Sequence, residues 1–277
     1  MRIPLLLPIL ALTCSFSQAD TIRGQVVAVD KESRELSIRL DSQESPQTFA
    51  VGAGDAAIGY LGQEIVGEPV DQPSSTLPRL NQIWPDNLIE RNAMDGVNRS
   101  LIREAALLGR GESLSRGDYL PDFALYNQRG EPVFASQLKN SPTVLTFIFT
   151  RCAVPQMCPA TSARLSQLGQ RAEAAGWDQA HFVAVSFDPD YDTPGILNQY
   201  ASAMGMDGEA FELLTGDLEA IEALLRLVGV RTIEEDGTIV HNLVTLLADD
   251  HGRIVLRQDG SRWSADAIYQ RMEKMFE

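Results

Sequence analysis

The segment TVLTFIFTRCAVPQMC, residues 143–158, decides the fold of this chain and holds its chemistry. Residues 143–149 form an unbroken apolar run, which is typical of a central strand covered on both faces. Cys152 lies just beyond this strand, and Cys158 lies at the entry to a predicted helix with Pro159 just inside it. In α/β folds, reactive groups lie where the carboxyl end of a strand opens into a helix.

Predicted strands and helices alternate along the rest of the C-terminal half. We predict a second buried strand over 181–187, helices over 160–175, 194–204 and 217–227, a hairpin that joins 243–247 to 253–256, and a last helix after Ser264. Strands that alternate with helices imply an α/β layer with a largely parallel core sheet.

The N-terminal half has a different pattern. Alternating and β-branched residues predict a small β-barrel or meander over 20–70. Prolines and serines then indicate a linker over 71–112, with a helix predicted over 86–108. The chain is therefore expected to place a small β domain and a helical linker before an α/β domain over 113–277.

The first nineteen residues resemble an export signal. Arg2 precedes an apolar stretch over 4–13, and Ala19 ends a small-residue cleavage pattern. The stretch is too short to span a bilayer. Thr13 is a poor match to a lipidation motif, which argues against a lipid anchor at Cys14. We expect residues 1–19 to be removed and the mature protein to be soluble and periplasmic, or otherwise extracytoplasmic.

The charge and the cysteines narrow the function further. A formal net charge of −15 argues against a nucleic-acid partner. Without Cys14, the mature chain keeps Cys152 and Cys158, which an oxidising compartment can join. A purely structural disulfide over so short a loop would stabilise the fold only modestly. The alternative is a reactive pair, in which the helix N-terminus lowers the pKa of a thiol.

His241 is the candidate imidazole partner of the two thiols. It lies in a polar-flanked segment, 237–242, that we interpret as a turn before the strand 243–247. In a thioredoxin-type sheet this turn lies against the loop after the first core strand, where thioredoxins place a cis-proline. A histidine at that position can bind a metal, and two thiolates with one imidazole suit Cu(I).

Three motifs in order make residues 113–277 resemble the SCO/SenC family of copper-binding, thioredoxin-like proteins. The first is 149–152 with Cys158 and Pro159, similar to F/Y-T-x-C-P-x-x-C-P. The second is DPDYDTP over 188–194, and the third is the downstream histidine, His241. One spacing departs from the family, because the cysteines here are C-x5-C and not C-x3-C.

The resemblance implies a thioredoxin-like fold, a copper ion, as Cu(I), Cu(II) or both, bound by Cys152, Cys158 and His241, and a carrier rather than an enzyme with turnover. The implied function is a metallochaperone that supplies copper to a respiratory cytochrome c oxidase, with an apo-oxidase subunit or another copper client as partner. The alternative is a thiol-disulfide oxidoreductase, with Cys152 and Cys158 as its redox-active pair and a thiol reductant as partner. A third reading is an adaptor whose thioredoxin-like domain is merely disulfide-bonded.

Overall fold

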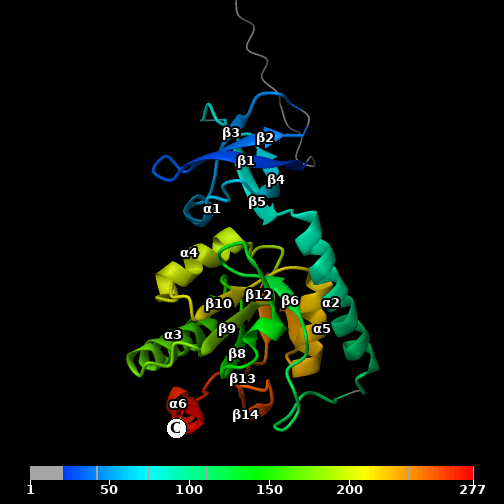
Figure 1. The fold of residues 1–277 in the computed structure, drawn as a ribbon, viewed down its shortest axis with the longest axis vertical. Helices are drawn as coiled ribbons and strands as arrows, with labels where there is room; N and C mark the ends of the chain where they lie inside the picture. Colours follow the sequence, from blue (N-terminus) through cyan, green and yellow to red (C-terminus); the bar gives the residue numbers. More distant parts are fainter. Residues whose placement is uncertain (1–20, 42, 74, 110, 236–237, 277) are drawn as a thin grey trace, which may run out of the picture.

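The computed structural model describes residues 21–276, apart from residues 42, 74, 110 and 236–237. The predicted signal over 1–19, with Cys14, lies outside the described residues. A small β part and a larger α/β part are joined by one long helix (Figure 1). Among the described helices, none is both long enough and apolar enough to cross a bilayer.

The N-terminal part is a closed five-stranded barrel with the strand order β1-β2-β3-β5-β4. Its elements are β1 (Ile22–Asp30), β2 (Glu35–Leu40), β3 (Gln47–Ala50), α1 (Ala53–Ile58), β4 (Glu64–Val70) and β5 (Arg79–Pro85). Along β2, Leu36, Ile38 and Leu40 are buried and alternate with more exposed residues, as a half-buried strand requires.

The last strand of the barrel, β5, lies in the stretch that we predicted as linker. Leu80 and Ile83 on this strand are buried in the barrel core. They are three residues apart and therefore do not show the alternating pattern of a strand. The register between β4 and β5 shifts between Val66 and Glu68, and this irregularity accommodates the unusual spacing.

The linker helix is α2 (Leu88–Leu107), and it packs along α5. The side chain of Asn87 accepts hydrogen bonds from the backbone amides of Ile89 and Glu90, so the helix begins at a well-formed cap.

The C-terminal part is built on a five-stranded sheet with the order β10-β9-β8-β13-β14. Its strands are β8 (Thr143–Ile148), β9 (His181–Ser186), β10 (Phe211–Leu214), β13 (Val244–Ala248) and β14 (Ile254–Asp259). Only β10, β9 and β8 are parallel, whereas β13 and β14 are antiparallel to their neighbours. The sheet is therefore mixed, because the predicted hairpin joins it at the edge beside β8.

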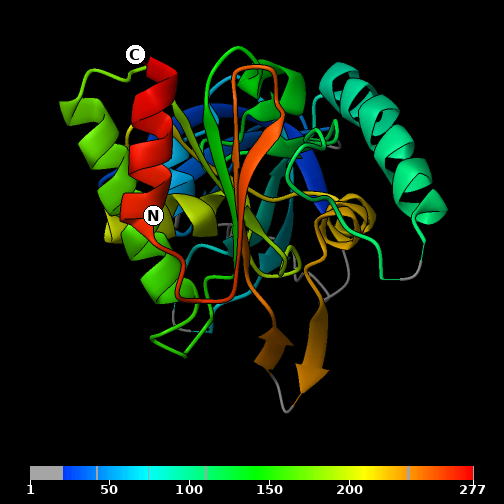
Figure 2. The same ribbon diagram turned by 90° about the horizontal axis from the view of Figure 1, so that it is seen from below.

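Helices cover both faces of this sheet, as Figure 2 shows: α3 and α6 (green and red) lie on one side, and α5 (gold) with α2 (teal) lies on the other. The helices are α3 (Cys158–Ala174), α4 (Pro194–Met204), α5 (Leu218–Val228) and α6 (Ala265–Phe276). A short hairpin of β6 (Ala124–Tyr126) and β7 (Pro132–Phe134), followed by the 3-10 turn η1 (Ala135–Leu138), precedes the sheet. All six residues of β8 are buried, as the apolar run predicted.

The barrel contains a buried carboxyl group that makes its stability depend on pH. Burial raises the pKa of Asp55 to about 6, and the Tyr60 hydroxyl and the Arg79 charge oppose this rise only in part. The folded chain therefore holds this proton more tightly than the unfolded chain, whose ordinary value is 3.8. The resulting contribution to the free energy of unfolding is about 3 kcal/mol. It is fully present below about pH 4 and is lost as the pH rises through about 6.

We expect Asp55→Asn to remove this pH dependence. Of this contribution to the free energy of unfolding, about 1–2 kcal/mol is lost between pH 5 and pH 7.5. Urea unfolding at these two pH values should show that the wild-type barrel loses this much more stability than the variant. Equal losses in the two proteins would contradict the assignment.

Candidate metal centre

The two cysteines lie on the loop between β8 and α3. Cys158 is the first residue of α3 and is fully buried, whereas Cys152 is partly exposed. Between them, residues 153–156 are exposed, so the loop stands at the surface of the molecule. Both cysteines are free thiols in this structure.

His241 is the last residue of β12 (Thr238–His241), which pairs with β11 (Thr232–Glu235) in a two-stranded ribbon. We expected a turn at this position, and the structure shows a strand end instead. His241 pairs directly with Thr232. The β-branched residues of both segments favour an extended backbone, and this preference outweighs the polar residues that suggested a turn.

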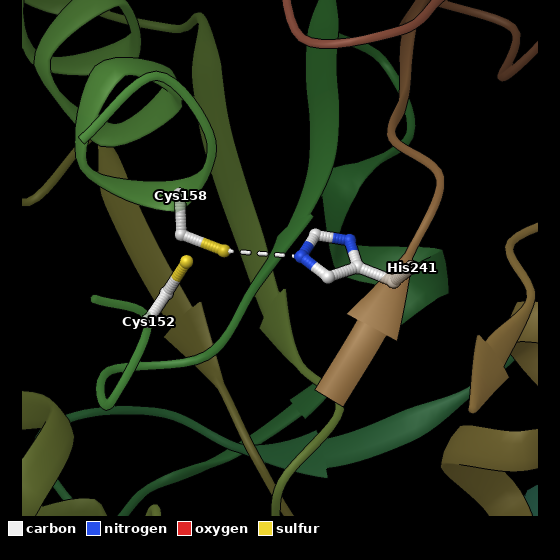
Figure 3. A group of neighbouring side chains, drawn as sticks. All are labelled: Cys152, Cys158 and His241. Atoms are coloured by element: carbon white, nitrogen blue, oxygen red, sulfur yellow. Dashed lines mark hydrogen bonds between the residues drawn. The ribbon is translucent and has the colours of Figure 1, made fainter. Parts of the chain in front are cut away.

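The structure brings the three predicted residues together. The sulfurs of Cys152 and Cys158 and a ring nitrogen of His241 all lie within 4.8 Å of one another (Figure 3). The Nε2 atom of His241 is 3.6 Å from the sulfur of Cys158. Residues from two segments more than eighty positions apart therefore point at one another.

The second ring nitrogen sets the tautomer of His241. Nδ1 lies 3.0 Å from the backbone carbonyl oxygen of Asn242, which can only accept a hydrogen bond. Nδ1 therefore carries the ring proton, and Nε2 presents its lone pair to the thiols. A backbone carbonyl behind a ligating histidine is a common way to fix the orientation of the ring.

Two aromatic residues that we did not predict form a wall around the imidazole. The ring of Phe149 meets His241 edge-on at 5.8 Å between centroids, and Phe187 lies at 4.6 Å. They directly follow β8 and β9, which are neighbouring parallel strands, so their positions at the ends of the two predicted buried strands, 143–149 and 181–187, were the available signal. This packing covers part of the imidazole, whose residue has intermediate exposure.

The environment shifts the pKa values of two of these groups. Burial raises the pKa of the Cys158 thiol well above its ordinary value, and the neighbouring Cys152 adds to the rise. We expected the helix N-terminus to lower the pKa of a thiol, but for Cys158 the loss of solvation outweighs the backbone hydrogen bonds that lower its pKa. Burial lowers the pKa of His241, with the Asn242 hydrogen bond opposing the shift. The imidazole thus stays neutral, while Cys158 must lose a proton to bind a metal.

The donor set fits a soft monovalent metal ion. With a metal–thiolate distance of about 2.3 Å, as for zinc, three trigonal donors lie about 4 Å apart. The present separations of up to 4.8 Å need only a small closure. Two thiolates and an imidazole are ligands that Cu(I) prefers over hard oxygen ligands.

Other side chains that could ligate a metal lie away from the site or hold the cysteine loop in place. Met157 directly precedes α3 as its N-cap residue. His181 is at the start of β9, the strand end away from the cysteines, and His251 is exposed beside Asp250 in the turn between β13 and β14. Asp192 is buried and accepts a hydrogen bond from the backbone amide of Thr150.

Comparisons with known proteins identify the family and the fold. The SCO1/SenC family model matches residues 111–277. A Stutzerimonas stutzeri protein whose name proposes that it binds copper is 30% identical over 158 residues, which are 53% of this chain and 75% of that protein. A SCO1 homologue of Bacillus subtilis is 25% identical over 142 residues, 50% of this chain and 72% of that protein.

Among solved structures, a SCO1/SenC family lipoprotein from Bacillus anthracis superposes with a TM-score of 0.54 at 27% identity. The match covers 60% of this chain and all of that one. The predictions of the family and of a thioredoxin-like fold are thereby confirmed.

Proposed function

Because the chain belongs to the SCO1/SenC family, we propose that it binds a copper ion through Cys152, Cys158 and His241 and passes the ion to a client protein. The observation that carries the proposal is the orientation of the imidazole. Its Nδ1 proton is engaged by a backbone carbonyl, and Nε2 directs its lone pair at the thiols. Plain thiol exchange does not need such a ligand.

The surface around the site supports transfer to another protein. Cys152 is partly exposed and Val154 is 49% exposed, so the ligands of a client can approach from this side. Following the family resemblance, we propose the copper site of a respiratory oxidase as the client. We also propose that the protein works after export, as the segment over 1–19 suggests.

An anaerobic titration of the fully reduced protein with Cu(I) tests the proposal. We expect one copper ion to bind per chain, because the site offers a single set of three donors. Competition with a coloured Cu(I) chelator measures both the stoichiometry and the affinity. If the chelator retains all the copper when chelator and protein are present at equal concentrations, the protein is not a copper carrier.

A thiol-disulfide oxidoreductase is the second candidate function. It is favoured by the different exposure of the two neighbouring thiols, since a partly exposed sulfur can attack a partner and a buried one can resolve the mixed disulfide. The reduction potential of the pair separates the two functions. A potential in the range of disulfide oxidoreductases, combined with weak copper binding, would favour this second function.

A further inference from the structure

Residues 188–193, here called the bridging loop, connect β9 to α4 and hold the chain just before the first cysteine. The carboxylate of Asp192 accepts hydrogen bonds from the backbone amide of Thr150, at 3.0 Å, and from its hydroxyl group. The guanidinium group of Arg151 donates two hydrogen bonds to Asp188, at 2.7 and 2.9 Å. The two residues that lead into the cysteine loop are thus bound to the bridging loop on one side.

The other side of the bridging loop contacts the barrel. The side-chain amide of Gln82, on β5, donates a 2.8 Å hydrogen bond to the backbone carbonyl of Asp190. The backbone of Gln82 has a φ of 49°, in the left-handed region that residues other than glycine rarely adopt. This unusual conformation lies at the point where the barrel reaches the bridging loop.

A second contact between the barrel and the α/β part lies directly after the bridging loop. Figure 1 shows α1 lying against α4. A Cβ atom on Gly54 would lie 1.8 Å from the carbonyl oxygen of Gly195, and one on Gly195 would lie 2.1 Å from the Asp55 carboxylate. The two helices can therefore meet at this distance only because both positions are glycine.

We propose that the docked barrel positions Cys152, acting through the bridging loop. The inference rests on the proposed copper site, and it gives the barrel a role that needs no metal ligand of its own. The five residues between the cysteines include four exposed ones, so the loop has few contacts to restrain it. A clamp on Thr150 and Arg151 reduces the conformations open to the loop, which lowers the entropy lost when the ligands close on a metal.

The variant Gly54→Ala tests the inference in the full-length protein, because its added methyl group collides with the α4 backbone. The matched control is Gly96→Ala on α2, where a methyl group meets nothing within 4 Å. We expect Gly54→Ala to separate the two parts in small-angle scattering and to speed amide hydrogen exchange over 150–157 in the metal-free protein. Its Cu(I) affinity should fall by about three- to tenfold, whereas the control should match wild type.

A second variant, Gln82→Asn, keeps an amide and a residue that tolerates the left-handed backbone, but it is one methylene too short for the contact with Asp190. It should also speed exchange over 150–157. Amide exchange over 150–157 at the wild-type rate in both variants would overturn the inference. So would a Gly54→Ala protein whose two parts separate while this exchange stays unchanged. Wild-type protein that binds no copper would instead refute the proposed function, because exchange is measured without metal.

Discussion

Replacing His241 with alanine is expected to weaken copper binding by at least about 100-fold. Loss of a hydrogen-bonding partner behind a metal ligand already costs about 10–100-fold in affinity, and loss of the ligand itself should cost no less. Nε2 of His241 is the one imidazole nitrogen that the structure, over the residues it describes, groups with the sulfurs of Cys152 and Cys158. Competition with a Cu(I) chelator measures the change.

The matched control for this experiment is His251→Ala. This histidine is exposed in the turn between β13 and β14, beside Asp250, and is not part of the cluster that contains the cysteines. Its removal should leave both the affinity and the stoichiometry unchanged. Equal affinity in His241→Ala and His251→Ala would exclude the imidazole from the site.

Oxidation of the metal-free protein is expected to join Cys152 and Cys158 and to abolish copper binding. The two sulfurs already lie within 4.8 Å of each other, and the exposed loop between them can move to bring them into bonding distance. Each disulfide releases two protons and two electrons to the oxidant and removes both thiolate ligands. Mass spectrometry after alkylation should show no free thiol at Cys152 or Cys158, and the Cu(I) titration should show no uptake.

Reduction and a cysteine variant serve as controls for the oxidation experiment. Treatment with a dithiol should restore copper binding in the wild-type protein. Cys152→Ser cannot form the internal disulfide. After treatment with oxidant and unfolding of the chain, its Cys158 should therefore still react with the alkylating agent. Full copper uptake by a protein with no free thiol would show that the cysteines are not the ligands.

The C-terminal part could be predicted from the sequence to a large extent, because its signals are local. The apolar run over 143–149 specifies a buried strand whatever lies beside it, and β8 is buried along its whole length. Pro194 and the capping residue Thr193 likewise mark the start of α4, where the Thr193 side chain accepts a hydrogen bond from the Ile196 amide. The chemical nature of two thiols and an imidazole was also enough to suggest a soft metal.

Other features depend on partners that are distant along the chain. No local pattern marks β5 as the strand that closes the barrel. Leu80 and Ile83 do not alternate with polar residues, and they are recognised as core residues only once they are seen packed in the barrel. The polar residues around His241 suggested a turn, whereas its β-branched neighbours pair with β11 and place His241 at a strand end opposite Thr232. Propensity is a property of a segment, whereas pairing is a property of two segments.

The sequence by itself determined the α/β fold class, the family and the identity of the three candidate ligands, since these follow from residue types and their spacing. Only the tertiary structure decided that Nε2 of His241 faces the thiols and that the pKa of Cys158 is raised. It also decided that the barrel reaches the cysteine loop through Asp190. The physical reason is that solvation and hydrogen-bond geometry depend on the atoms packed around a group, and most of these come from elsewhere in the chain.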